Sequence, residues 1–340
     1  MKNVFKMNMI EKIKDWFRIF RAQTAADVFL LVLLPYLVAG GEFFSWFTLT
    51  LALWSILVHH ISFGHNTVLD TMLGWDSRDP NKRHHPLISK RIKKETALKV
   101  VSIGFFVCTV AAIIFVYYGS GNSYFSMTFF SLFIVGGFVY NNGISKISVW
   151  DFIPITICFT SLSLFSFFLI AKEFNELIIL IAVYIALLEW FQIGVEGEIK
   201  EIEIDDEKNM LRKLGTKIKS NIFSMGHSVI YPWILKLAGL AVAGYIVYKY
   251  TWEWYTVLTL FAWAILAIIF CFRLTRKRTW DRKNALRDMA VEEIISIFLL
   301  SFILIPIIGL LEIAIILLVG LFYFVGMNAL LWHTRLAPKV

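Results

Sequence analysis

Long apolar runs alternate with short charged segments along almost the whole chain. Most runs reach the roughly 20 residues that a membrane-spanning helix needs. The sequence therefore predicts an all-α polytopic membrane protein, a helical bundle of nine or ten transmembrane helices. The expected helices cover residues 25–41, 44–66, 98–118, 123–140, 151–171, 176–197, 226–248, 253–272, 291–309 and 312–332. Little more than Pro306, Gly309 and Glu312 separates the last two, so both counts stay open.

The first 24 residues have a different pattern. Apolar residues recur at helical spacing with basic residues between them, namely Phe5, Met9, Ile13, Phe17 and Phe20 among Lys2, Lys6, Lys12, Lys14 and Arg18. This pattern predicts an amphipathic helix on a membrane surface over residues 1–24. The alternative is a solvated basic arm. Residues 25–340 are expected to form a single transmembrane domain.

Composition and charge placement support the same class. Hydrophobic residues make up 58% of the chain and the mean hydropathy is +0.70, whereas soluble domains are about 45–50% apolar. With a cytoplasmic N-terminus, ten spans place all but four of the 33 Lys and Arg residues on the cytoplasmic side. That asymmetry follows the positive-inside rule, so it explains the net charge of +8 without nucleic-acid binding. The three cysteines lie far apart in apolar runs and are expected to be buried thiols.

A first charged segment, residues 64–98, stands between two apolar runs. It contains Asn66-x-x-x-Asp70 and Asp76, followed by the basic residues Arg78, Lys82 and Arg83. Carboxylates held near a helix end at a membrane face need a counter-charge. Mg²⁺ takes few carboxylates directly and shares its other positions with water and phosphate oxygens. The basic residues suit the rest of a diphosphate.

A second acidic segment follows the sixth expected helix. Seven of the twelve residues 196–207 are acidic, and Glu198, Glu201 and Asp205 would share one face of a continued helix. A bound divalent cation would remove their mutual repulsion. The alternative is a solvated acidic turn, balanced by Lys200, Lys208, Arg212 and Lys213.

These segments carry a family resemblance. Residues 64–98 resemble the first aspartate-rich motif of the UbiA superfamily of intramembrane prenyltransferases, Asn-x-x-x-Asp-x-x-x-Asp with a later Arg-Pro-Leu. Asn66 and Asp70 fit, Asp76 fits with two inserted residues, and His85-Pro86-Leu87 replaces Arg-Pro-Leu.

Two further stretches add to the resemblance. Glu201-x-x-x-Asp205, preceded by Glu198 and followed by Lys208 and residues 214–216, looks like the family's second motif. Tyr140, Lys146 and Asp151 match, in order, the family's residues between its fourth and fifth helices.

The resemblance implies a Mg²⁺-dependent enzyme that moves an isoprenyl group from an allylic isoprenyl diphosphate to a lipophilic acceptor. Its site would lie in loops 64–98 and 196–219 and open near the cytoplasmic face. The implied catalytic residues are Asn66, Asp70, Asp76, Tyr140 and Lys146. The implied metal ligands are Asp70, Asp76, Glu198, Glu201 and Asp205. The implied diphosphate ligands are Arg21, Arg78, Lys82, Arg83, Lys146 and Lys208.

Two other functions stay open. The same fold could serve a terpene cyclase or a transferase that uses polyprenyl phosphate. A non-enzymatic divalent-cation or lipid-binding membrane protein is the second alternative, although a transporter should carry charges near the bilayer midplane. His59 and His60 precede the first motif and are expected to bond to backbone or water, and Lys236 is expected either to snorkel or to pair within the bundle.

Overall fold

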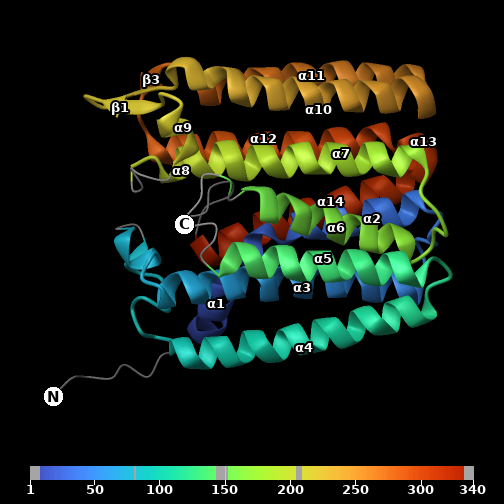
Figure 1. Cartoon of the computed structure of the whole chain (residues 1–340), viewed down its shortest axis with the longest axis horizontal. Helices are drawn as coiled ribbons and strands as arrows, with labels where there is room; N and C mark the ends of the chain where they lie inside the picture. The colour runs from blue at the N-terminus through green and yellow to red at the C-terminus, as the bar shows by residue number, and fades with distance from the viewer. Residues whose placement is uncertain (1–7, 80–81, 143–149, 151, 204–208, 333–340) are drawn as a thin grey trace.

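The protein is a bundle of long helices that lie side by side, shown here as a computed structural model (Figure 1). The structure describes residues 8–79, 82–142, 150, 152–203 and 209–332. The α-helices are α1 (Met9–Ile19), α2 (Ala25–Val38), α3 (Trp46–Met72), α4 (Lys94–Tyr118), α5 (Ser123–Asn141), α6 (Phe152–Phe168), α7 (Glu176–Phe191), α8 (Glu198–Glu201), α9 (Met210–Lys213), α10 (Ile230–Tyr250), α11 (Trp254–Thr275), α12 (Arg282–Ile303), α13 (Ile305–Ile308) and α14 (Leu310–Trp332).

Short elements complete the chain. The 3₁₀ turns are η1 (Ala22–Thr24), η2 (Asp76–Arg78) and η6 (Gly226–Val229), and the π-helix η5 (Gln192–Gly197) joins α7 to α8. The strands β1 (Lys217–Lys219), β2 (Ile222–Ser224) and β3 (Arg278–Thr279) form one antiparallel sheet in the order β1-β2-β3. Ser220 and Asn221 both have positive φ, as a tight two-residue hairpin turn requires.

The all-α prediction is confirmed, and the apolar helices have membrane dimensions. Seven helices of the described chain are long and apolar enough to cross a membrane: those that end at Met72, Tyr118, Asn141, Glu201, Tyr250, Thr275 and Trp332. Two shorter apolar helices cover residues 22–38 and 152–168. The expected count of nine or ten spans exceeds these seven and stays a prediction.

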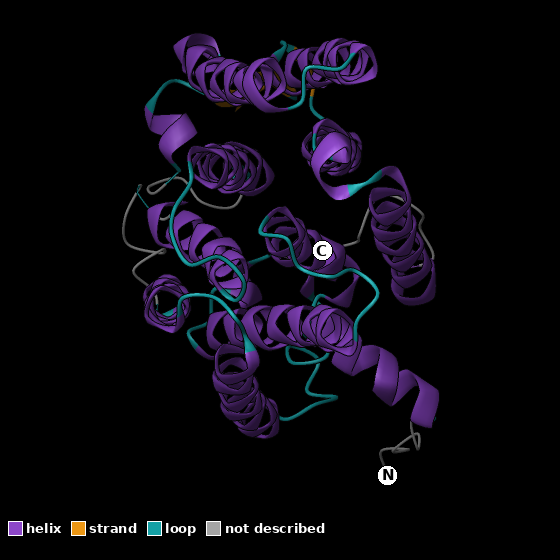
Figure 2. Ribbon diagram, turned by 90° about the vertical axis from the view of Figure 1, so that its right-hand side faces the viewer, coloured by secondary structure: helices purple, strands orange, loops and turns teal. Residues whose placement is uncertain are grey.

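Burial distinguishes the inner helices from the outer ones. Nearly every side chain of α2 and most side chains of α6 are buried, and α2 packs against α3, α6 and α14. The outer helices α4 and α11 expose apolar side chains such as Phe106, Leu258 and Phe261. Such surfaces are costly in water and compatible with lipid. Figure 2 looks along the bundle and shows the long helices nearly end-on.

Side-chain caps and glycines place the helix boundaries. Asn122, Asn175 and Asp281 accept hydrogen bonds from backbone N–H groups in the first turns of α5, α7 and α12. Gly309, with φ of 115°, separates α13 from α14, so α12 and α14 run in opposite directions (Figure 1).

Both charged segments reach the same end of the bundle, at the left of Figure 1. Both segments contain more helix than the sequence analysis expected. Helix α3 continues through Asn66 and Asp70 to Met72, and α4 begins at Lys94. Helix α7 continues through η5 and α8 to Glu201. The helices therefore fix Asn66, Asp70, Glu198 and Glu201 more firmly than a loop would.

Candidate active site

Asn66 and Asp70 lie one turn apart on α3, and both are buried. The Arg21 guanidinium donates to Asn66 Oδ1 at 3.3 Å and lies over the Phe63 ring. Arg21 itself precedes η1, between α1 and α2. The contact brings a predicted diphosphate ligand to the predicted metal motif.

Asp76 is buried just beyond the end of α3. Its carboxylate accepts hydrogen bonds from Lys82 Nζ at 2.6 Å and Thr71 Oγ1 at 3.2 Å. Burial alone would raise the pKa of Asp76, but the charge and hydrogen bond of Lys82, with the charge of Arg21, lower it below its usual value. Asp76 is therefore a charged carboxylate at neutral pH.

Arg282, at the start of α12, connects the two charged segments. Its Nη2 pairs with Asp79 at 3.2 Å, and its Nη1 lies 3.8 Å from Glu203. Trp280 Nε1 also donates to Glu203. The structure thus joins residues 64–98 to residues 196–219 through a residue that the sequence analysis did not select.

Four cations gather at this end of the bundle. The charges of Arg21, Lys82 and Arg282 all act on Lys200, which lies on α8 between Glu198 and Glu201. We call Arg21, Lys82, Lys200 and Arg282 the cation group. Arg282 Nη1 is buried and makes no hydrogen bond within the described structure, so it can donate to a ligand. Sequence reasoning assigned Lys200 to charge balance, because its spacing carries no signal of convergence.

The other predicted residues have varied surroundings. Arg78 and Arg83 are exposed, and Arg78 stacks on Trp75 with its guanidinium 4.4 Å from the ring centre. Glu198 is buried and Glu201 exposed. Tyr140 is half-buried at the end of α5, beside Asn141. Lys146, Asp205 and Lys208, like Asp151, lie outside the described residues.

His85 stands where the family motif has arginine. Burial lowers its pKa to about 4, while Asp76 acts in the opposite direction. The imidazole is therefore neutral at neutral pH, and this replacement removes a positive charge from the motif.

A cavity of about 240 Å³ extends into the bundle from Arg21 and Lys200, two members of the cation group. Its lining residues are Arg21, Gln23, Thr24, Asp27, Val28, Leu31, His59, Phe63, Phe159, Glu189, Gln192, Ile193, Glu196, Gly197, Lys200, Leu286, Met289, Ala290, Glu293 and Phe324. Arg21 and Lys200 mark its outer end, and aromatic and aliphatic side chains line much of the rest. The cavity can hold a molecule with a charged end and an apolar body.

His59 and His60 on α3 bond to backbone, as expected. His59 Nε2 lies 3.2 Å from the Arg21 carbonyl oxygen and 3.2 Å from Thr24 Oγ1, and His60 Nδ1 lies 2.5 Å from the Ile56 carbonyl oxygen. His59 also stacks on Phe63, which lines the cavity. These contacts fix the cavity wall beside Arg21.

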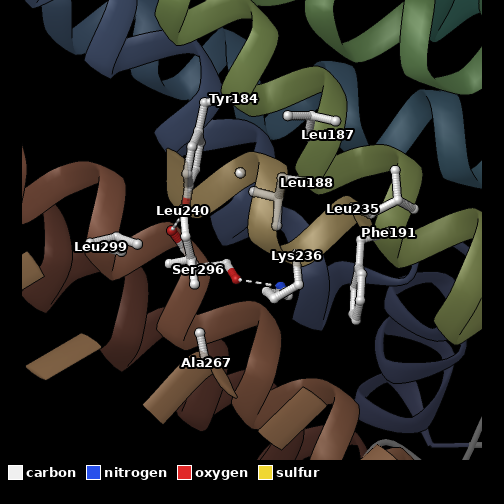
Figure 3. A pocket seen from close by; sticks show the side chains of 11 residues that line it. Tyr184, Leu187, Leu188, Phe191, Leu235, Lys236, Leu240, Ala267, Ser296 and Leu299 are labelled. Carbon is white, nitrogen blue, oxygen red and sulfur yellow. Dashed lines mark hydrogen bonds between the residues drawn. The ribbon is translucent and has the colours of Figure 1, made fainter. Parts of the chain in front are cut away.

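A second pocket lies between α7, α10 and α12 (Figure 3). There Lys236 pairs with Glu292 and donates to Ser296 Oγ at 3.2 Å, and Ser296 Oγ donates to Glu292 at 2.7 Å. This confirms the expected pairing of Lys236 within the bundle. The charges of Lys236 and Glu292 balance each other, so we interpret these residues as a structural polar contact between helices.

Carboxylates at the charged end are the side chains that could bind Mg²⁺. Among the described residues, no three His, Cys, Asp or Glu side chains gather as a metal site. Mg²⁺ commonly takes one or two carboxylates and completes its shell with substrate phosphates and water. The buried Asp70 and Asp76, beside cations suited to a diphosphate, are compatible with that donor set.

The fold and the site define an integral membrane bundle with a charged pocket at one end. The UbiA prenyltransferase family matches residues 28–294, and the chain belongs to this family. Comparison with curated protein sequences finds no match.

Two solved structures are similar. One is a digeranylgeranylglyceryl phosphate synthase, with a TM-score of 0.60 and 16% identity over 88% of this chain and 100% of that one. The other is a UbiA homologue from Archaeoglobus fulgidus bound to DMAPP and Mg²⁺, with a TM-score of 0.58 and 13% identity over 87% and 99%. At these identities the likeness establishes the fold.

Proposed function

We propose that this protein is a Mg²⁺-dependent intramembrane prenyltransferase that moves an isoprenyl group from an allylic isoprenyl diphosphate to a lipophilic acceptor. The observation that carries the proposal is the convergence of the cation group at the outer end of a cavity with aromatic walls. The family assignment and the homologue bound to DMAPP and Mg²⁺ support it.

The cation group binds the diphosphate and stabilises the charge that grows as it leaves. Arg21, Lys82, Lys200 and Arg282 act in a partly water-excluded site, where such interactions are strongest. Asn66 accepts a hydrogen bond from Arg21 and so orients its guanidinium. Arg78, Arg83, Tyr140, Lys146 and Lys208 remain predicted contributors.

Asp70 and Asp76 would hold Mg²⁺, with Glu198, Glu201 and Asp205 as the second predicted set. When bound, Mg²⁺ would neutralise diphosphate oxygens and assist ionisation. The aromatic ring of Phe159 stabilises the allylic cation, and the apolar wall excludes the water that would quench it.

We also propose how the protein is oriented in the membrane. The N-terminus lies in the cytoplasm, the site opens near the cytoplasmic face, and the bundle crosses the membrane nine or ten times. Helix α1 lies on the membrane surface, which agrees with its exposed Met9, Ile10 and Ile13.

The test is pyrophosphate release by the purified protein. Geranylgeranyl diphosphate and shorter allylic diphosphates are supplied with Mg²⁺, then with EDTA. We expect Mg²⁺-dependent release, at least about 100-fold weaker in Asp70→Asn because an essential charge is lost. The exposed Glu95→Gln, at the same end, serves as the matched control and should keep its activity.

Product analysis separates the alternatives. A prenylated lipid in the organic phase supports transfer, whereas a cyclised hydrocarbon identifies a terpene cyclase. If the protein neither releases pyrophosphate with lipid extract added nor binds the allylic diphosphates, the proposal is wrong and a non-enzymatic role is favoured.

A further inference from the structure

Four acidic side chains from three helical segments face the same cavity. Asp27 is in the first turn of α2, Glu189 and Glu196 lie along α7 and η5, and Glu293 is on α12. We call these four residues the acidic cluster. Sequence analysis selected none of these four as a site residue, although Glu196 belongs to the second acidic segment.

The members of the acidic cluster lie close together. The carboxyl groups of Asp27 and Glu293 are within hydrogen-bonding range of each other, and the charge of Glu293 acts on both Glu189 and Glu196. Lys236, the cation nearest Glu196 in the bundle, already pairs with Glu292. Acidic groups crowded inside an apolar bundle are costly unless a ligand compensates them.

Unpartnered hydrogen-bond acceptors line the same cavity and are an independent indication of a ligand. Gln23 Oε1 and His59 Nδ1 make no hydrogen bond within the described structure. Both residues are only 1% exposed. His59 Nε2 faces the Arg21 carbonyl oxygen and so carries the ring hydrogen, which leaves Nδ1 as an acceptor.

Unpartnered hydrogen-bond donors are scarce among the side chains that line this cavity. Among the described lining side chains, Gln192 Nε2 is the unpartnered buried donor. A ligand that complements the wall must therefore supply several O–H or N–H donors. An anionic ligand would meet carboxylates and bare acceptors.

Depth separates the inner part of the acidic cluster from the cation group. Glu189 precedes Lys200 by eleven residues, and Glu293 follows Arg282 by eleven residues. At 1.5 Å per helical residue, each interval is about 16 Å. Glu196 lies between the two ends, only four residues before Lys200. A headgroup that extends from the inner acidic cluster to Glu196 therefore reaches C1 of a donor whose diphosphate is held by the cation group.

A smaller cavity of about 30 Å³ continues from the acidic cluster between α2, α12 and α14. It shares Asp27, Glu293 and Phe324 with the main cavity, and apolar residues such as Leu30 and Leu321 line the rest. Leu321 is exposed on the outside of the bundle. A hydrocarbon chain can reach the bilayer along this path.

We propose that the acidic cluster binds the headgroup of the prenyl acceptor, an uncharged or cationic lipid headgroup with several hydroxyl or ammonium donors, whose chain follows the smaller cavity. This assignment rests on the proposed function and names the acceptor class. As an acceptor oxygen or nitrogen attacks C1 of the donor, the C1–O bond breaks and its electron pair leaves with the diphosphate. The proton lost by the nucleophile passes to a carboxylate of the cluster.

The test compares three probes with the same twelve-carbon chain: 1-O-dodecylglycerol, dodecylamine and dodecanoate. Binding is measured without donor or Mg²⁺, by tryptophan fluorescence and thermal shift of the protein in phosphatidylcholine nanodiscs. We expect the diol, the amine or both to bind at least about tenfold more tightly than dodecanoate, and their ratio tells a hydroxyl from an ammonium headgroup. Equal or tighter binding of dodecanoate overturns the proposal.

Substitutions in the acidic cluster test whether the probes bind there. Asp27→Asn, Glu189→Gln and Glu293→Gln should each weaken the preferred probe about tenfold, whereas the exposed loop variant Glu173→Gln should bind as the wild type does. Unchanged binding in all three cavity variants also overturns the proposal. If a variant does not fold, the wild-type comparison of probes still decides. Because no turnover is involved, failure of prenyl transfer and failure of this assignment give different results.

Discussion

Arg21 organises the outer end of the cavity through both its backbone and its side chain. Its φ of 46° is left-handed, which is unfavourable for a residue with a side chain. Its carbonyl oxygen accepts from Thr24 Oγ1 at 3.0 Å and from His59, while its guanidinium reaches Asn66. The surrounding contacts hold this conformation and aim the guanidinium at the first motif.

Substitution of Lys200 tests whether the cation group binds the diphosphate of the donor. Lys200→Met should raise the KM for the allylic diphosphate about tenfold or more, because a charge-assisted contact is lost. Steady-state pyrophosphate release measures the effect. Lys213→Met, exposed on α9, makes the same substitution outside the cavity and should leave KM unchanged. Equal effects of the two would mean that Lys200 acts through net charge alone.

Asp15 gives a prediction about pH. It is 1% exposed and accepts from Arg91 Nε at 2.7 Å and Arg18 Nη1 at 2.8 Å. Burial alone would raise the pKa of Asp15, but the two arginines lower it below 3.8. A carboxylate with a lowered folded pKa stabilises the protein above its unfolded pKa, and this contribution disappears as pH falls through the folded pKa.

Asp15→Asn should therefore reduce the free energy of unfolding by about 2 kcal/mol at pH 7. The difference from wild type should shrink as the pH falls below 3.8. Thermal unfolding of the wild type and the variant in detergent, at pH 7 and at a pH below 3.8, measures this difference in stability. Glu11→Gln removes a half-exposed acid on the same helix and should change stability by less than about 1 kcal/mol. A pH-independent difference would exclude the ionic explanation.

At the element scale, η5 distinguishes α7 from the other long helices. A π-helix inserts an extra residue into a turn and shifts the direction of the side chains that follow. Here it occupies residues 192–197, between Glu189 and Lys200. The wide turn thus falls where the cavity wall changes from the acidic cluster to the cation group.

Two glycines in η5 give a matched pair of substitutions. A Cβ at Gly194 would lie 2.8 Å from Tyr231 Oη and 3.0 Å from Trp190 Cδ1. Gly194→Ala should therefore destabilise the protein by about 1–3 kcal/mol. At Gly197 the nearest contact is 3.6 Å, so Gly197→Ala should be neutral or stabilise by up to about 1 kcal/mol. Thermal unfolding compares them, and equal stability of the two would show that η5 relaxes around the added methyl group.

At the scale of the whole molecule, charged groups gather at one end and apolar side chains cover the sides of the bundle. The end that carries residues 64–98, 196–219 and the three-stranded sheet is opposite the turn between α6 and α7 (Figure 1). The native thiols Cys108, Cys158 and Cys271 are all buried. Introduced cysteines can therefore report the topology.

Ser77 is in η2, within the charged segment 64–98, and Lys172 lies in the turn between α6 and α7, at the opposite end of the bundle. In intact cells, a membrane-impermeant maleimide should label Lys172→Cys and spare Ser77→Cys, because the proposed topology puts the charged end in the cytoplasm. Permeabilised cells should label both, and the wild type gives the background. Labelling of Ser77→Cys alone in intact cells would reverse the proposed orientation.

The sequence by itself determined the class of protein and the helix positions. Membrane helices are long and apolar, so local composition and length suffice to place them. The spacing of Asn66 and Asp70 is also local, because residues four apart meet on one helix face. These local features carried the family resemblance, which the match over residues 28–294 confirmed.

Only the tertiary structure decided which distant residues meet. Arg282 joins Asp79 to Glu203 across separate segments, and no pattern near Arg282 predicts this contact. The acidic cluster likewise depends on α2, α7 and α12 packing around one cavity. Periodicity specifies the face of a helix, whereas the partner of that face is set by side-chain packing between helices.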